Sequence, residues 1–441
     1  MSNPTQSLEI SGRQTLEGPS PIAPMSWKRG FWSLIVTQFQ GAFSDNVLKN
    51  LVVFVIVAAG YTQAQKHQIG ESVGALFALP FILFSMAGGY LADRCSKRTI
   101  CIGVKVFEVG VMLFVCLGFW LNSLPMLLAS VFLMGTHSAF FGPSKYGSLP
   151  ELLPLERLSW GNGILELGTF MAIILGTVVA AMLAEYFRGQ HIWSACLLVV
   201  LAVLGLITSL GITKVPAAAP NRRFNANLFS ELWRQVTSIR SDRPLMLATA
   251  GNTYFNFLGA LFLLNLFYFG MEVLHVSEKG IGILTVSLAL GIGVGSFAAG
   301  YFSRGRIENG FIPPGSLGMA VAAIVASLPG LGFAGSLVSL AALGLAGGFF
   351  IVPVTAILQH RPAPENKGEV LAAANLLSFV GVFLASGAHW ILSQALGLGP
   401  RAVFLVGGLL TLGGTVLVAF LTPASMKRFL SLCGLGRAQA L

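Results

Sequence analysis

Charged residues are scarce in this chain. Only 10% of its 441 residues are Asp, Glu, Lys or Arg, whereas 55% are hydrophobic and the mean hydropathy is +0.78. A soluble protein carries about 25% charged residues. The shortage of charge excludes an ordinary soluble domain and predicts an all-α membrane protein that crosses the bilayer many times.

Several motifs of processing and catalysis are also missing. The first 26 residues are polar and contain no apolar core of a signal peptide, so we expect no cleavable leader. The five cysteines form no Cys-x-x-Cys pair and have no histidine at metal-ligand spacing, which favours a packing role. No nucleophile–base set is visible. We therefore expect no enzyme, no cofactor and no metal site.

Long apolar segments fill most of the remaining sequence. A membrane-spanning helix needs about 20 mostly apolar residues, and twelve segments meet this requirement. The predicted spans are residues 31–60, 72–92, 99–121, 125–144, 159–186, 191–212, 244–270, 280–302, 311–331, 333–358, 368–395 and 400–421.

The basic residues follow the loops between these spans. With the N-terminus inside, 21 of the 27 Lys and Arg residues fall on the inner side and only four on the outer side. This asymmetry is the positive-inside pattern of the cytoplasmic membrane. It predicts a multi-pass inner-membrane protein with both termini in the cytoplasm, and it accounts for the net charge of +10 without a nucleic-acid partner.

The two halves of the chain repeat each other. "GGYLADR" follows the second predicted span and "AAGYFSRGR" follows the eighth, while "FFGPSKYGSLPELL" and "FFIVPVTAILQHRP" end the fourth and the tenth. Six spans followed by six spans in parallel halves are typical of the major facilitator fold. The predicted parts are a polar cytoplasmic tail (1–30), an N-terminal six-helix bundle (31–213), a cytoplasmic linker with an amphipathic helix (214–243), a C-terminal six-helix bundle (244–421) and a cytoplasmic tail (422–441).

The turn after the second span, "GGYLADRCSKR", closely resembles the signature loop of the major facilitator superfamily. The spacing fits Gly89, Asp93, Arg94 and Arg98. Glycine permits close helix packing, and a carboxylate can meet the positive N-terminal end of a helix in the other half. The resemblance implies that these four residues latch the outward-facing state. The alternative is a basic turn that serves only to set topology.

Polar residues inside the predicted spans concentrate in the N-terminal half. An ionised group at mid-bilayer costs at least about 2.5–3.5 kcal/mol, so such residues are usually functional. The candidates for a substrate-binding surface are Gln38, Asp45, Asn46, Lys49, Lys105, Glu108, Lys145, Asn162 and Glu166. Asp45 with Lys49, and Lys105 with Glu108, stand four and three residues apart on one helix face, so each pair has self-neutralisation as its alternative.

The C-terminal half has a different character. No charged residue lies between Pro244 and Gly270, where the sequence reads "YFNFLGALFLLNLFYF", or between Ile281 and Phe302. A cavity with one charged wall and one apolar, aromatic wall suits an amphiphile. Its head group would face the N-terminal half and its acyl chain would follow the C-terminal half.

Three longer sequence segments indicate a particular family within this superfamily. "FSDNVLKNLVVF", "FFGPSKYGSLPELLP" and "GNGILELGTFMAIILG" resemble the lysophospholipid transporter family, especially the transporter portion of its fused transporter–acyltransferase members. The likeness is densest between Gln38 and Gly176. It implies inward movement of lysophosphatidylethanolamine or lysophosphatidylglycerol for re-acylation, and it implies that Asp45, Asn46, Lys49, Lys145 and Glu166 belong to the polar cavity.

The sequence departs from the fused members because no acyltransferase segment with His-x4-Asp is present. Re-acylation would then need a separate acyltransferase partner. The leading hypothesis is a monomeric secondary transporter of lysophospholipids that works by alternating access. The second hypothesis is a proton-coupled exporter of drugs or small metabolites on the same fold, and the third is a membrane subunit that regulates an acyltransferase through residues 214–243.

Overall fold

The protein is almost entirely helical in the part of the chain that the structure describes, residues 27–58, 63–222 and 227–432 of a computed structural model. Most of the predicted N-terminal tail and the end of the C-terminal tail lie outside these residues. The first half contains α1 (Trp27–Ala58), α2 (Gln63–Arg94), α3 (Lys97–Trp120), α4 (Leu124–Leu152), α5 (Leu158–Tyr186) and α6 (Ile192–Ser209).

The second half repeats this order of long helices. It contains α8 (Arg243–Tyr268), α9 (Glu278–Phe302), α10 (Ile312–Ala326), α11 (Gly332–His360), α12 (Lys367–Trp390) and α13 (Pro400–Leu421). Two further helices lie outside the repeat, α7 (Leu228–Ser241) and α14 (Pro423–Leu432). Short helical turns are η1 (Leu155–Arg157), η2 (Phe269–Val273), η3 (Asn309–Phe311), η4 (Pro364–Asn366) and η5 (Ile391–Ala395).

Twelve of these helices form the membrane-embedded body. Eleven helical segments of the described chain are long and apolar enough to cross a bilayer. α1, with 32 residues, is the twelfth long helix and packs along α5 and α6. The predicted all-α membrane fold is confirmed, and the protein is a multi-pass membrane protein. Proline interrupts α2, α4 and α11 without ending them, as neighbouring helices allow in membrane proteins.

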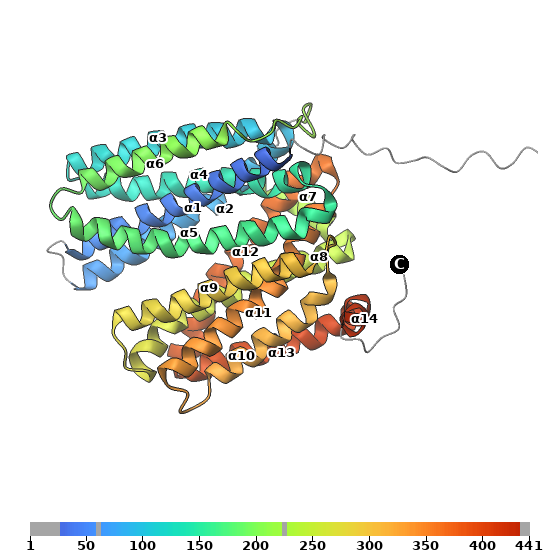
Figure 1. Cartoon of the computed structure of the whole chain (residues 1–441). Helices are drawn as coiled ribbons and strands as arrows, with labels where there is room; N and C mark the ends of the chain where they lie inside the picture. Colours follow the sequence, from blue (N-terminus) through green and yellow to red (C-terminus); the bar gives the residue numbers. More distant parts are fainter. Residues whose placement is uncertain (1–26, 59–62, 223–226, 433–441) are drawn as a thin grey trace, which may run out of the picture.

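The two halves lie side by side (Figure 1). Each half has its own apolar core. Val47, Met112 and Leu198 lie in the core of the first half, and Phe262, Leu284 and Phe404 lie in that of the second. α2 packs against α12 and α5 packs against α9, so these two pairs join the halves.

The linker between the halves carries α7, which lies at the same end of the molecule as α14 (Figure 1). We call this end the linker end. Asn227 caps α7 by accepting a hydrogen bond from the backbone of Ser230, and Asp242 caps α8 in the same way. Ile239 of α7 is 3% exposed and Trp233 is 71% exposed, so the helix has one buried and one open face. The linker helix thus packs on the bundle surface.

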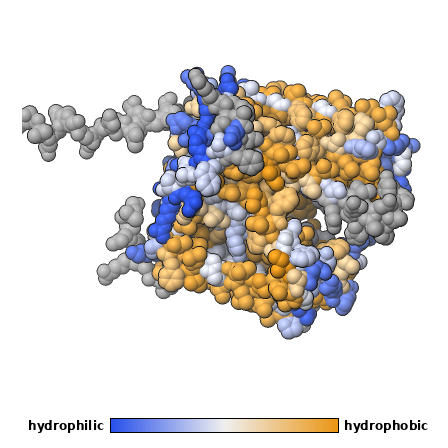
Figure 2. Space-filling view, turned by 180° about the vertical axis from the view of Figure 1, so that it is seen from behind, coloured by the Kyte–Doolittle hydropathy of each residue, from blue (hydrophilic) through white to orange (hydrophobic). Residues whose placement is uncertain are grey.

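Hydrophobic residues cover the flanks of both halves, and hydrophilic residues gather at the two ends (Figure 2). Exposed flank residues include Val106 and Leu113 of α3 and Leu204 of α6. An apolar band with polar ends is what a bilayer requires of a helix bundle. The same view shows the surface hollowed between the halves, away from the linker end (Figure 2).

Candidate functional site

Four polar side chains form a closed cluster inside the N-terminal half. The Lys105 ammonium lies 2.5 Å from Glu108 Oε2 and 2.6 Å from Gln40 Oε1. Gln40 Nε2 donates to Glu108 Oε1 at 2.8 Å, and His137 Nε2 lies 3.1 Å from Glu108 Oε2. Lys105 and Glu108 are both 0% exposed. A buried charge pair persists only when hydrogen bonds satisfy its remaining groups, and this cluster supplies them.

This cluster changes the interpretation of two predicted substrate contacts. The sequence places Lys105 and Glu108 on a binding surface, whereas the structure places them in packed protein between α1, α3 and α4. In this conformation neither side chain reaches a cavity. Their three-residue spacing on α3 pairs them with each other, so the self-neutralising alternative describes their geometry.

The predicted pair on α1 behaves differently. Asp45 and Lys49 are half-buried, and no ion pair within 4.0 Å joins these two described side chains. Asp45 Oδ2 accepts a 2.6 Å hydrogen bond from Ser138, while its Oδ1 is buried without a partner. Lys49 donates to Asn46 Oδ1 at 3.2 Å and lies 5.2 Å from the centre of the Phe77 ring. Self-neutralisation therefore does not describe this pair.

Lys145 and Glu166 come together where the halves meet. The Lys145 ammonium lies 4.8 Å from the centre of the Tyr146 ring, and the Tyr146 hydroxyl donates to Glu166 Oε1 at 3.2 Å. Tyr146 packs against the apolar cores of both halves. Lys145 is close enough to Glu166 and Asp45 to interact electrostatically with both, yet no described carboxylate lies within 4.0 Å of it. The ammonium can therefore pair with an anionic group of a ligand.

Gln38 and Asn162, also predicted to bind substrate, make contacts within the protein. The Gln38 amide donates to the Thr169 hydroxyl and joins α1 to α5. Asn162 and Gln359 exchange two amide hydrogen bonds of 2.8 Å each, and both are 0% exposed. Because Asn162 lies on α5 and Gln359 on α11, this pair ties the two halves together near the linker end.

Asp93 forms a second tie at the linker end. Its carboxylate accepts hydrogen bonds from the backbone N–H groups of Gly368, at 2.6 Å, and Glu369, at 3.1 Å. These groups belong to the first turn of α12, where a helix carries its positive dipole end. A Cβ atom on Gly89 would lie 2.6 Å from Ala372 Cβ and 2.7 Å from Gly368 O. Glycine at this position lets α2 and α12 approach closely.

The two arginines of the predicted latch have their hydrogen bonds, among the residues that the structure describes, within the first half. Arg94 Nη1 donates to the hydroxyl of Tyr90, one turn earlier on α2, at 2.5 Å. Arg98 Nη2 donates to the carbonyl of Leu210 at the end of α6, at 2.8 Å. The structure thus brings Gly89 and Asp93 to α12 and keeps Arg94 and Arg98 within the first half.

A linker arginine joins the tie instead. Arg222 Nη2 lies 2.5 Å from Glu369 Oε2, and Arg222 Nη1 donates to Asn366 Oδ1 at 2.9 Å. Arg234 and Gln235 of α7 also donate to Glu369 Oε2. These contacts attach the linker to the start of α12, beside Asp93.

Glu231 anchors the α7 side of this network. It accepts hydrogen bonds from Arg234 and Gln235. Burial alone would raise the pKa of the Glu231 carboxyl, but hydrogen bonds with Arg234, Glu369 and Gln235 and the nearby Arg234 charge lower it to about 2. The carboxyl is therefore ionised at neutral pH.

The family is decided by a match along most of the chain. The sequence profile described as Major Facilitator Superfamily matches residues 34–386. The chain belongs to the Major Facilitator Superfamily. The matched region runs from α1 into α12, so it includes the loop after α2 and its contact with the start of α12.

Curated relatives narrow the comparison within the Major Facilitator Superfamily. The chain is 29% identical over 365 residues to proteins named "Lysophospholipid transporter LplT" from Salmonella heidelberg and Salmonella typhimurium. Each alignment covers 79% of this chain and 84% of the relative. The predicted resemblance to lysophospholipid transporters is confirmed at this level.

Solved structures of other superfamily members share the fold. The human organic anion transporter MFSD10 superposes with a TM-score of 0.73 at 15% identity, over 89% of this chain and 99% of that one. The fucose–proton symporter of E. coli superposes with a TM-score of 0.72 at 13% identity, over 90% and 99% of the two chains. At these identities the likeness concerns the fold alone.

In this Major Facilitator Superfamily member, several residues that the sequence analysis did not single out complete the site. Asn375 of α12 lies across from α4, because a Cβ atom on Gly142 would be 3.8 Å from its Nδ2, and that Nδ2 has no hydrogen-bond partner. Gln359, Arg222 and Glu369 supply ties at the linker end. One sequence signal could have found Asn375: Asn162 and Gly168 stand six residues apart in α5, and Asn375 and Gly381 stand six residues apart in α12.

Proposed function

We propose that this protein transports lysophospholipids, such as lysophosphatidylethanolamine or lysophosphatidylglycerol, inward across the cytoplasmic membrane by alternating access. The observation that carries the proposal is the unpaired Lys145 ammonium, which lies beside Glu166 and Asp45 where the halves meet. The names of the curated relatives support the same substrate class. The carried lipid would be delivered for re-acylation by a separate acyltransferase.

We assign head-group binding to the polar side chains around Lys145. The Lys145 ammonium would pair with the lipid phosphate as a point charge. Glu166 and Asp45 are placed to meet the amine of an ethanolamine head group. Asn375 would add a hydrogen bond from the second half, because its free Nδ2 faces α4. These four side chains come from α1, α4, α5 and α12, so they can respond together when the halves move.

The acyl chain would follow the wall formed by the second half. α8 contributes aromatic and amide side chains to this half, and its amide nitrogens donate within the protein: Asn252 Nδ2 to Ser378, Asn256 Nδ2 to the Asn252 carbonyl and Asn265 Nδ2 to the Pro400 carbonyl. Amide donors that are already engaged need no polar ligand. An apolar chain suits such a surface better than a sugar or an amino acid would.

The conformation of the chain corresponds, in this proposal, to the outward-facing state. The direct hydrogen bonds between the halves in the described chain come from Asp93, Ser159 and Asn162, and all three lie near the linker end. The excess of basic residues in the same loops supports a cytoplasmic position of the linker end. Gly89 and Asp93 would act as the latch that holds this end closed.

The proposal is tested by lysophospholipid uptake. Spheroplasts that lack their own uptake activity would be supplied with labelled lysophosphatidylethanolamine, with and without this protein. We expect saturable uptake that depends on the protein and is competed by unlabelled lysophospholipid. Transport of another solute that stops with an uncoupler, while lysophospholipid neither enters nor competes, would reject the proposal and favour the proton-coupled exporter.

A further inference from the structure

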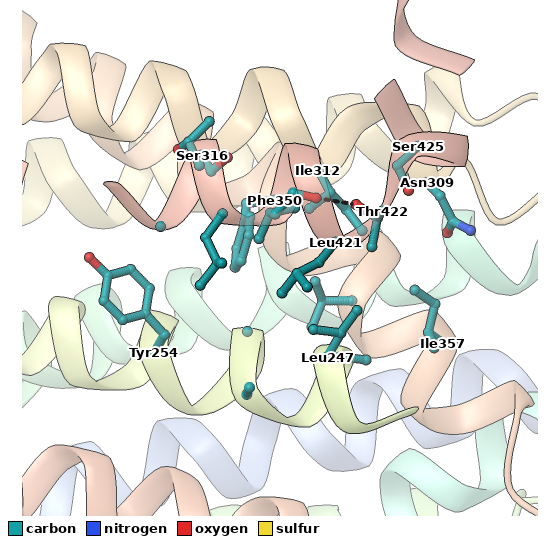
Figure 3. Close-up of a pocket in the computed structure, with 18 of the residues that line it drawn as sticks. Leu247, Tyr254, Asn309, Ile312, Ser316, Phe350, Ile357, Leu421, Thr422 and Ser425 are labelled. Carbon is teal, nitrogen blue, oxygen red and sulfur yellow. Dashed lines mark hydrogen bonds between the residues drawn. The ribbon is translucent and has the colours of Figure 1, made fainter. Parts of the chain in front are cut away.

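A pocket inside the second half lies apart from the surface where the halves meet. It is enclosed by α8, α10, α11 and α13 and reaches the linker end beside α14. Its volume is about 480 Å³, within the range of roughly 300–1,000 Å³ that is typical of small-molecule sites. Figure 3 shows Tyr254 at one end and Asn309, Thr422 and Ser425 at the other. The pocket is therefore elongated along the helices.

The interior of this pocket is apolar and offers a ligand few groups for hydrogen bonding. Leu247, Phe350 and Val354 line it. The hydroxyl groups of Tyr254, Thr411 and Thr415, which also line it, form hydrogen bonds within the protein. The Tyr254 hydroxyl lies 2.7 Å from the Thr411 hydroxyl, and Thr415 donates to the carbonyl of Thr411 at 2.8 Å. A ligand in the deep part of the pocket should therefore be a hydrocarbon.

The corresponding region of the first half is filled. Phe31, Leu34, Cys101 and Leu149, which are fully buried, pack between α1, α3 and α4 near the linker end. These helices hold the places that α8, α10 and α11 hold in the second half. In the second half, open space lies against α13, since a Cβ atom on Gly414 would have no heavy atom within 4 Å. The first half also has a hollow at this end, but Arg29, Arg98 and Lys214 line it, so it lacks the apolar character of the pocket in the second half.

The length of the pocket fits one acyl chain. Thr411 and Leu421 both line it and are ten residues apart on α13, a distance of about 15 Å at 1.5 Å per residue. One leaflet of a bilayer core of about 30 Å gives each acyl chain about the same reach. The pocket has room for one such chain beside the helices.

The mouth of the pocket carries a cation. Arg243 is exposed there, donates to the carbonyl of Leu421 at 3.1 Å, and has no described carboxylate within 4.0 Å. The neighbouring acids are occupied by other arginines, because Asp242 pairs with Arg361 and Glu308 pairs with Arg428, each at 2.7 Å. Arg243 can therefore bind an anionic head group at the membrane surface.

We propose that this pocket binds a single-chain anionic amphiphile, with the acyl chain between α8 and α13 and the head group on Arg243. A free fatty acid and a lysophospholipid both have this chemistry. The site lies within one half and near the linker end, so it does not depend on the transport function proposed above. Occupancy would fill a gap in the packing of the second half.

The experiment uses the full chain in phosphatidylcholine nanodiscs. Two probes, a fatty acid and a lysophosphatidylglycerol, each carry a photoreactive group at the end of the acyl chain, and labelled peptides are identified by mass spectrometry. We expect saturable labelling of α8 at residues 247–254 and of α13 at residues 411–418. Labelling by one probe alone identifies the source of the amphiphile, and labelling by both assigns recognition to the chain and the charge.

Adjacent glycines of α13 provide a matched pair of variants. Gly414→Leu would fill the pocket and abolish saturable labelling of α8. Gly413 also has no heavy atom within 4 Å of an added Cβ, but it is exposed and does not line the pocket, so Gly413→Leu should label normally. Thermal unfolding of both variants verifies that they fold.

Arg243→Gln tests the head-group contact without touching the core. We expect it to weaken labelling by up to about fivefold, the contribution of an exposed ion pair. Arg401→Gln, at the other end of α13, should have no effect. Unchanged labelling in both Gly414→Leu and Arg243→Gln, equal loss in Gly413→Leu, or labelling confined to lipid-facing residues would overturn the proposal.

Discussion

Single charged residues inside the first half have two different surroundings. Lys105 and Glu108 neutralise each other in packed protein, and their polar atoms are engaged by Gln40 and His137. Lys145 lies where the halves meet and has no described carboxylate within 4.0 Å. The first arrangement stabilises a fold, whereas the second leaves a charge available for a ligand. Substitution of Lys145 is therefore expected to reduce transport, whereas substitution of Glu108 is expected to reduce stability.

Lys145→Gln should abolish most lysophospholipid uptake. Loss of a charge-assisted contact of about 1.5–3 kcal/mol corresponds to a decrease of roughly 10- to 100-fold. Uptake rates per folded protein would be compared with those of Lys279→Gln, a control that removes a lysine outside the site. Equal uptake in the two variants would remove Lys145 from the head-group site.

Glu108→Gln should instead destabilise the protein. Removal of one partner of a buried ion pair leaves the other charge uncompensated and costs about 3–5 kcal/mol. The variant with Lys105→Met and Glu108→Met together should recover part of this loss, since no uncompensated lysine remains. Thermal unfolding in detergent measures both effects. A Glu108→Gln variant with unchanged stability but no uptake would place Glu108 in the transport site after all.

At the scale of helices, we propose that the α2–α12 contact controls closure of the linker end. Gly89→Leu would push a side chain against Ala372 and the carbonyl of Gly368, where a Cβ alone meets atoms at 2.6–2.7 Å. We expect the linker end to open, and a cysteine replacing Asn162 to react faster with a thiol reagent. Gly103→Leu on α3 is the control, because a Cβ there has no heavy atom within 4 Å. Equal reactivity in the two backgrounds would contradict this role of Gly89.

The linker helix has its own pH dependence. The pKa of Glu231 is lowered from 4.5 to about 2 in the folded protein, so its ionised form contributes stability that is fully present above pH 4.5. That contribution is lost as the pH falls from 4.5 toward about 2. The difference in melting temperature between the unaltered protein and Glu231→Gln should be present at pH 6 and should shrink as the pH falls below 4.5. A difference that already disappears near neutral pH would contradict the assigned pKa.

At the scale of the whole molecule, the sequence predicts the helices better than the site. Hydropathy and segment length are local properties, so the twelve long helices and the short turn between α10 and α11 could be located directly. Helix spacing also indicated that Lys105 and Glu108 share a face. It could not show that the face points into packed protein, because that depends on how α3 rotates against α1 and α4.

The features of the site that the sequence did not predict are contacts between segments that lie far apart in the chain. Asn162 meets Gln359 across 197 positions, and Arg222 meets Glu369 across 147. No local pattern distinguishes these residues from ordinary polar residues near helix ends. The loop after α2 predicted a latch of four residues, yet only Gly89 and Asp93 reach α12. The partners of Arg94 and Arg98 depend on where α2 and α6 end.

Facilitated entry of lysophospholipid into a sealed membrane tests the account most directly. Purified protein would be reconstituted into liposomes, and fluorescent lysophosphatidylethanolamine would be added outside, where an impermeant quencher destroys the signal of every molecule that has not crossed. The account predicts protected fluorescence that rises faster with the protein than with lipid alone and loses this advantage in the Lys145→Gln variant. Protection no faster than in protein-free liposomes would contradict it.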